Sequence, residues 1–228
     1  MENLNASQNI ILEERRKKNN DFILQQSIAC YEDLPLTESS AEVTLKSVET
    51  IAKRAIGALL VIQVIYDIQA GDFEGSVEFF RGKLKQFDIG DELLNSKELR
   101  ILNGTYTQQD LFDMDWAYEA VWSLYYALGL VDDIRDGGET CDCELAISLV
   151  SKKSSFDEFV SQCKLRDIEE ILDMLDLYYR YDWAVTENRI RPNTNIGNLV
   201  PSNVVERRRG LEWLISEEDD WYDLSLDT

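Results

Sequence analysis

QDLFDMDWAYEAVWSLYYALG, residues 109–129, decides the fold class of this chain. Its apolar side chains, among them Trp116, Trp122 and Leu128, recur at the spacing of an α-helix. Gly129 then occupies the position where a helix commonly ends. We therefore predict a buried central helix over residues 109–130.

The same spacing and the same end signals run through most of the chain. A second apolar helix is predicted from Val48 to Tyr66, with Ser47 as its N-cap, and it is apolar on all sides toward its end. Further helices are predicted over residues 7–27, 73–87, 96–102, 142–150, 155–163, 167–188 and 203–216. No strand pattern of comparable strength is present.

The predicted architecture is therefore all-α, a single domain of about eight helices over residues 1–228. An irregular segment is expected near residues 29–46, which carry Pro35 and no helical period. The first residues and the acidic tail, residues 217–228, are expected to lie at the periphery.

The composition indicates a globular protein that stays in the cytoplasm. Hydrophobic residues make up 44% and charged residues 29%, as in ordinary folded domains. The first twenty residues lack the order and length of a secretory signal. The longest apolar run, residues 58–66, is too short to span a membrane, so no membrane binding is expected.

The net charge is -21, and residues 110–182 hold eighteen acids against six bases. Such a surface would repel a phosphate backbone, so we expect no nucleic-acid binding. It would attract a basic protein, which is the partner that the charge favours. Alternatively, the acidity serves only solubility.

Several kinds of site are excluded by what the sequence lacks. There is no histidine, which removes histidine-based catalytic triads and histidine-ligated metal sites. Cys141 and Cys143 are too close for an ordinary disulfide, while Cys30 and Cys163 stand alone, so reduced thiols are expected. The Cys-Asp-Cys spacing is also shorter than that of zinc ribbons. We assign no catalytic residue, expect no bound metal and no cofactor, and interpret the cysteine pair as structural.

Three charged side chains fall among apolar neighbours when the helices are drawn as wheels: Glu119, Asp182 and Arg207. Buried charges are costly unless they are paired, so these either meet in an ion-pair network or line a pocket. For Glu119 a simpler alternative is open, because Asp115, Glu119 and Ser123 repeat at every fourth position and could form a solvated stripe.

Arg207 is predicted to be buried or half-buried and to pair with Asp182, Glu119 or Glu206, in that order of preference. It shares a helical face with apolar residues, whereas the two arginines that follow it point progressively away from that face. These two are expected to be solvated.

Four blocks of sequence resemble one family. They are LPLTESSAEVTLKSVETIAKRAIGAL from Leu34, WAYEAVWSLYYALGLVDDI from Trp116, LRDIEEILDMLDLYYRYDWAV from Leu165 and VVERRRGLEWLI from Val204. Together they are similar to the uncharacterised bacterial domain-of-unknown-function family 4272. The resemblance implies a bacterial, cytoplasmic, helical protein with no established activity, and a histidine in relatives where this chain has Asp182.

The functions that remain open are a binding or regulatory protein, a small-ligand-binding protein, and an enzyme that works without histidine. The first is favoured, and its sharpest form is an immunity-type protein that neutralises a basic toxin. The candidate ligand- or partner-binding residues are Glu119, Trp122, Arg180, Asp182, Trp183, Glu206, Arg207, Trp213 and Trp221. An enzyme would draw on the charged members of this set together with Trp183 and Trp213. The oligomeric state is left open.

Overall fold

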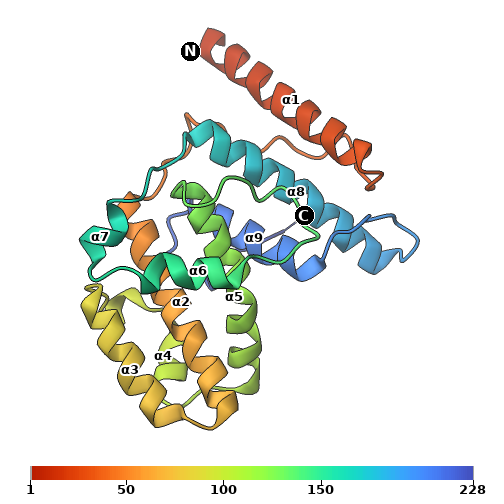
Figure 1. The fold of residues 1–228 in the computed structure, drawn as a ribbon. Helices are drawn as coiled ribbons and strands as arrows, with labels where there is room; N and C mark the ends of the chain where they lie inside the picture. The colour runs from red at the N-terminus through yellow and green to blue at the C-terminus, as the bar shows by residue number, and fades with distance from the viewer. Residues whose placement is uncertain (1, 228) are drawn as a thin grey trace.

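The computed structural model describes residues 2–227, with side chains from Gln8 onward, and this part of the chain is all-α (Figure 1). It contains nine α-helices, two short 3₁₀ helices and no strand. The α-helices are α1 (Glu2–Gln25), α2 (Val48–Ala70), α3 (Phe73–Gln86), α4 (Ser96–Leu102), α5 (Gln108–Ala127), α6 (Cys143–Ser151), α7 (Phe156–Val160), α8 (Ile168–Ile190) and α9 (Pro201–Trp213), and the 3₁₀ helices are η1 (Asp91–Leu93) and η2 (Trp221–Asp223). The predicted fold class is confirmed.

The core forms around α5, which packs against α9 on one side and α2 on another. Helix α8 packs against α9, and α1 packs along α8 at the edge of the molecule (Figure 1). Helices α2 and α5 contribute the largest sets of buried residues, as the sequence predicts. Within residues 2–227, no helix combines the length and the apolar character needed to cross a membrane.

The helix ends follow the predicted signals. The Ser47 side chain accepts a hydrogen bond from the N–H of Thr50, and Gly71 ends α2 in the left-handed conformation at φ 88°. Asn95 and Glu98 form a reciprocal capping box at the start of α4. These local hydrogen bonds fix the first residues of α2 and α4. Both helix starts border the pocket described below.

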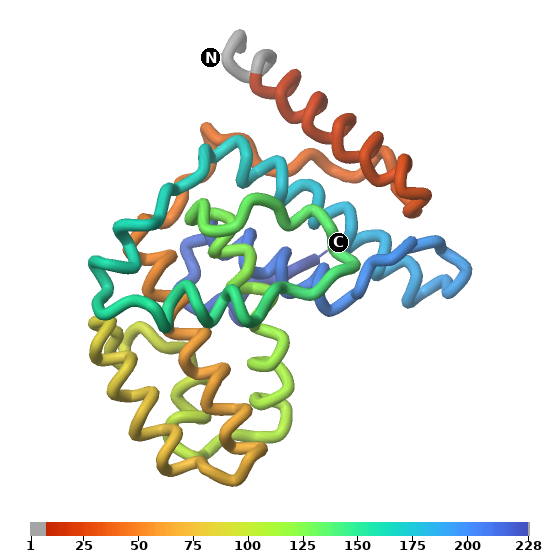
Figure 2. Tube along the Cα trace, in the orientation of Figure 1, coloured from red at the N-terminus to blue at the C-terminus, as the bar shows by residue number. Residues whose placement is uncertain are grey.

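Residues 29–46 have no regular helix, as predicted, and Figure 2 shows this segment returning alongside α1. The C-terminal tail runs to Asp227 with most of its side chains exposed or half-buried. Trp221 is the exception, because it is completely buried with its ring against Trp213. The tail is acidic along its length, but one aromatic side chain provides enough apolar area to anchor it. Thr228 lies outside the described residues.

Candidate functional site

The first arginine of α9 closes a network at the centre of the molecule. Arg207 Nε donates to Glu119 Oε2 at 2.7 Å, and both side chains are 3% exposed. The other nitrogens of Arg207 donate to three carbonyl oxygens in the loop 134–139. Glu119 Oε1 accepts from the N–H of Cys141 at 2.8 Å. Burial of Arg207 is confirmed, but its partner is Glu119; the preferred partner, Asp182, was wrong.

Helices α5 and α9 approach closely beside this pair. A Cβ on Gly210 would lie 2.6 Å from the carbonyl oxygen of Ala120. The Ser123 hydroxyl donates to a carbonyl oxygen of α9 at 3.0 Å. The alternative of a solvated stripe is therefore wrong, because Asp115 is exposed whereas Glu119 and Ser123 are buried.

The second arginine, Arg208, was expected in solvent and is instead 3% exposed. It forms an ion pair with Asp182 on α8 and donates to the carbonyl oxygens of Leu226 and Asp227 in the tail. Burial raises the pKa of Asp182, and the charge of Arg208 partly offsets this rise. Since α9 lies between α5 and α8, successive arginines face different helices, and both are enclosed.

A third buried pair joins Arg180 to Asp176, one turn apart on α8, through two hydrogen bonds of 2.8 Å. Arg180 also donates to Asn20 Oδ1, while Asn19 and Thr37 donate to the Asp176 carboxylate. The pair therefore holds α1 and the irregular segment against α8. Sequence reasoning missed Asp176, although its position four residues before Arg180 was a usable signal.

Of the remaining predicted residues, Trp213 and Trp221 pack ring against ring, whereas Glu206, Trp122 and Trp183 lie on three different helices. Glu206 pairs with Arg209 at 3.1 Å, so Arg209 is also enclosed rather than solvated. Trp122 is half-buried against Tyr125, and Trp183 is half-buried against an aromatic ring of the irregular segment. The nine candidates do not form one site.

A cavity of about 450 Å³ lies between the start of α2, the segment joining η1 to α4, and the tail. Arg54 and Asn95 line it. Trp213 lines it as well, and it is the one predicted site residue among the lining residues. Four acids also line the cavity: Glu49, Glu92, Asp219 and Asp220. Lys53 is the one lysine among the lining residues.

Arg54 is a buried cation with an incomplete set of partners. Its guanidinium pairs with Glu98, donates to the carbonyl oxygen of Leu93 at 3.1 Å, and stacks 4.9 Å from the ring centre of Trp221. Its Nε atom has no hydrogen-bond partner. Glu98 already neutralises the charge of Arg54, so the cavity gains no free positive charge from it. The unpaired Nε atom is enclosed by protein beside the cavity.

Asn95 holds a second buried donor that has no hydrogen-bond partner. Its Oδ1 accepts from the first N–H groups of α4, while its Nδ2 has no partner. Trp221 Nε1, beside Arg54, also has none. Across the described side chains, four buried polar atoms lack a partner, and these three are all donors in one region; the fourth is Asn203 Oδ1. An unpaired buried donor costs about 1–3 kcal/mol. These three atoms are enclosed by protein, so a ligand in the cavity could use them only after the side chains turn toward it.

Part of this region was predictable from the sequence. Trp213 and Trp221 were predicted as site residues, whereas Asn95 was not. Arg54 was overlooked, although it is a charge inside a helix whose neighbours are nearly all apolar. Its significance depends on the tail, which approaches α2 only in the folded chain.

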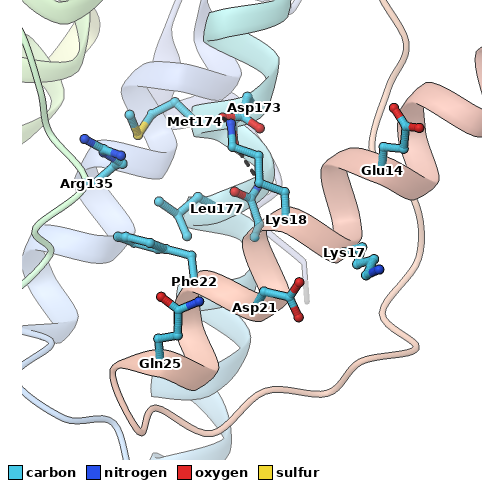
Figure 3. Close-up of a pocket in the computed structure, with 11 residues that line it drawn as sticks. Glu14, Lys17, Lys18, Asp21, Phe22, Gln25, Arg135, Asp173, Met174 and Leu177 are labelled. Atoms are coloured by element: carbon cyan, nitrogen blue, oxygen red, sulfur yellow. Dashed lines mark hydrogen bonds and ion pairs between the residues drawn. The ribbon is translucent and has the colours of Figure 1, made fainter.

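A second hollow, of about 490 Å³, lies between α1 and α8 and is shown in Figure 3. Lys18 reaches from α1 to Asp173 on α8 at 2.6 Å, and Phe22 lies near Arg135. None of the predicted residues and none of the unpaired buried atoms lines it. Among the described side chains, no group of three or more Cys, Asp and Glu is placed to hold a metal ion.

The chain belongs to the family described as a domain of unknown function, DUF4272, whose model matches residues 15–224. The matched range includes the pocket around Arg54 and all three buried arginine pairs. No curated protein and no solved structure gives a significant match.

Proposed function

We propose that this protein is a non-catalytic binding protein that holds a basic segment of a protein partner in the pocket between α2, α4 and the tail. The observation that carries the proposal is the ring of four acids around the cavity, next to buried side chains of Arg54 and Asn95 whose unpaired donors would turn toward a bound acceptor. A backbone carbonyl of a peptide supplies the acceptor, and a lysine or arginine side chain of the same peptide supplies the positive charge.

The net charge supports a basic peptide over a small anion. The ring of Trp213 does not add to this, because it is 2% exposed and the Lys46 ammonium already lies 4.8 Å from its centre. The net charge of -21 would steer a basic partner toward the protein. An anion would meet the acids before it reached the donors.

The buried charges that an enzyme would have used support a structural role instead. Glu119, Asp182 and Glu206 each pair with a different arginine of α9, and Arg180 pairs on its own helix. These pairs join helices, loop and tail, and none of them lines the pocket.

The most specific candidate for the partner is a basic toxin, such as a nuclease. This protein would neutralise it by covering its basic surface. Charge complementarity supports this candidate, since oppositely charged surfaces raise association rates and exclude other partners. A toxin gene next to the gene for this protein would favour it, and a neighbouring set of metabolic genes would favour a small ligand.

The proposal is tested by titration calorimetry with three probes: acetyl-tetraarginine amide, spermine, and acetyl-tetraglutamate amide. Spermine matches the charge of tetraarginine but has no carbonyl acceptor. Tetraarginine should bind, spermine should bind about tenfold more weakly, and tetraglutamate should not bind. Equal binding of tetraarginine and spermine would contradict a role for the buried donors.

Variants test whether tetraarginine binds at the pocket. Asn95→Ser keeps a helix cap but removes the free donor, and should weaken tetraarginine binding about five- to tenfold at nearly unchanged stability. Glu49→Gln combined with Asp219→Asn should also weaken it. The matched control, Glu144→Gln with Asp157→Asn, changes the net charge equally at exposed acids outside the pocket. Equal losses in the two double variants would show nonspecific attraction.

A further inference from the structure

Cys141 and Cys143 lie at the start of α6 with their Sγ atoms 3.8 Å apart. Both are free thiols. Cys141 is buried, at 7% exposure, whereas Cys143 is exposed to solvent. The two thiols therefore differ in access while remaining within reach of each other.

The local geometry makes Cys143 the more nucleophilic of the two. It is the first residue of α6, a helix of nine residues, and the N-terminus of a helix stabilises a thiolate. The hydrogen bond from the Cys141 thiol also holds the pKa of Cys143 below its ordinary value. The same hydrogen bond, together with burial, raises the pKa of Cys141. The buried sulfur therefore holds its proton more tightly than the exposed one.

The position of Cys141 is fixed by the central network. Its backbone N–H donates to Glu119 Oε1, and the other oxygen of that carboxylate pairs with Arg207. A buried thiol held in this way cannot turn freely toward solvent, but it remains beside Cys143.

We infer that Cys141 and Cys143 form a thiol–disulfide exchange site, with Cys143 as the attacking sulfur and Cys141 as the resolving sulfur. The Cys143 thiolate attacks a small disulfide, the substrate S–S bond breaks, and one thiolate leaves and takes up a proton. Cys141 then loses its proton and attacks Cys143 Sγ, which releases the second thiol. In total, one disulfide and two protein thiols become two small thiols and one protein disulfide.

The one-residue spacing bears on the fate of the product. A disulfide across such a short segment is strained, and strained disulfides are readily reduced. This spacing suits an exchange reaction that returns to the dithiol, and it makes a permanent structural bridge unfavourable.

The charges around Cys143 select the substrate. Asp115 from α5 and Asp142 from the α6 N-cap place negative charge near this thiol, and this charge opposes the lowering of its pKa. Glu119 also lies nearby, but its charge is paired with Arg207. A disulfide with acidic groups is repelled by this field, whereas a cationic disulfide is attracted. The site is therefore expected to prefer cationic disulfides, then neutral ones, then anionic ones.

The test compares cystamine, which is cationic, with the neutral 2-hydroxyethyl disulfide and the anionic dithiodiglycolate. Formation of the protein disulfide is followed by intact mass and by titration of the remaining thiols. Because the leaving thiols differ in pKa, each rate is divided by the rate of the same probe with free 2-mercaptoethanol. At low salt this normalised rate should be about tenfold or more higher for cystamine than for dithiodiglycolate, and the ratio should shrink at high salt because exposed charges are screened. Equal normalised rates for the three probes at low salt would overturn the assigned selectivity.

Variants separate the two sulfurs. Cys143→Ser should remove the fast reaction, while Cys141→Ser should leave a stable mixed disulfide on Cys143. The double variant Cys30→Ser with Cys163→Ser is the control and should react like the unsubstituted protein. Circular dichroism checks that each variant is folded. A long-lived mixed disulfide in the unsubstituted protein, or a Cys143→Ser variant that reacts as fast, would overturn the proposal.

Discussion

Two buried arginine–glutamate pairs, Arg207 with Glu119 and Arg54 with Glu98, use the same residue types and differ in how completely their hydrogen bonds are made. Each side-chain nitrogen of Arg207 has an acceptor. At Arg54 the Nε atom has none, and the neighbouring Nδ2 of Asn95 has none either. The Arg207 pair is closed on all sides by protein, whereas the Arg54 pair borders a cavity.

The difference separates a structural ion pair from a candidate binding site. A closed network satisfies the desolvated groups and leaves no capacity for a ligand. A network that borders a cavity, such as that of Arg54, keeps unpaired donors, and other interactions in the fold offset the free-energy cost of burying them. Charge and burial are alike in the two places, so the unpaired atoms are the distinguishing feature.

The largest expected effect tests whether the Arg207 network is structural. Arg207→Ala leaves Glu119 buried without its charged partner and should lower the free energy of unfolding by about 3–5 kcal/mol. Arg191→Ala is the control, because its side chain is 76% exposed and its ion pair with Glu187 should contribute no more than about 0.5 kcal/mol. Urea unfolding measures both. Equal, small losses would mean that the network does not stabilise the core.

A smaller effect should distinguish the two tryptophans beside the pocket. Trp213 Nε1 donates to the carbonyl oxygen of Asp219 at 3.0 Å, whereas Trp221 Nε1 has no partner. Replacement by Phe removes a similar volume from two side chains that are both nearly inaccessible. Trp213→Phe should therefore cost about 1 kcal/mol more than Trp221→Phe in urea unfolding. The reverse order would imply that Trp221 has a partner and that the donor set is smaller than proposed.

The smallest effect concerns pH and the carboxylates around Arg208. Burial raises the pKa of Asp182 and of Glu212, with Arg208 opposing the rise in each case. The folded state thus binds protons more tightly than the unfolded state. This contribution to stability is complete below a pH of about 4 and is lost as the pH rises through the folded pKa values.

The melting temperature should accordingly rise modestly as the pH falls from 7 toward about 4. Asp110 does not interfere, because its pKa is lowered, mainly by Arg100, and it stays ionised across this range. Glu212→Gln should flatten the dependence, since it removes one of the raised groups. A melting temperature that falls steadily over the same range would contradict the raised pKa values.

Much of the fold was predictable because it depends on neighbours close in sequence. The period of α5 and the Ser47 cap are decided within a few residues, and both were found as predicted. The candidate site was less accessible. Trp213 and Trp221 were identified, but Arg54 and its neighbour were not, since a helix cap and a charge in a helix have ordinary structural explanations.

By itself, the sequence determined the helical elements, the acidity and the burial of Arg207, because period, composition and amphipathic position are local properties. Only the tertiary structure decided which carboxylate pairs with which arginine. Glu119 and Arg207 are 88 positions apart, and their pairing follows from the placement of α9 between α5 and α8. The same placement buries Arg208, which a single-helix projection assigned to solvent. A helical wheel gives the direction of a side chain, but burial depends on how many neighbouring helices surround it.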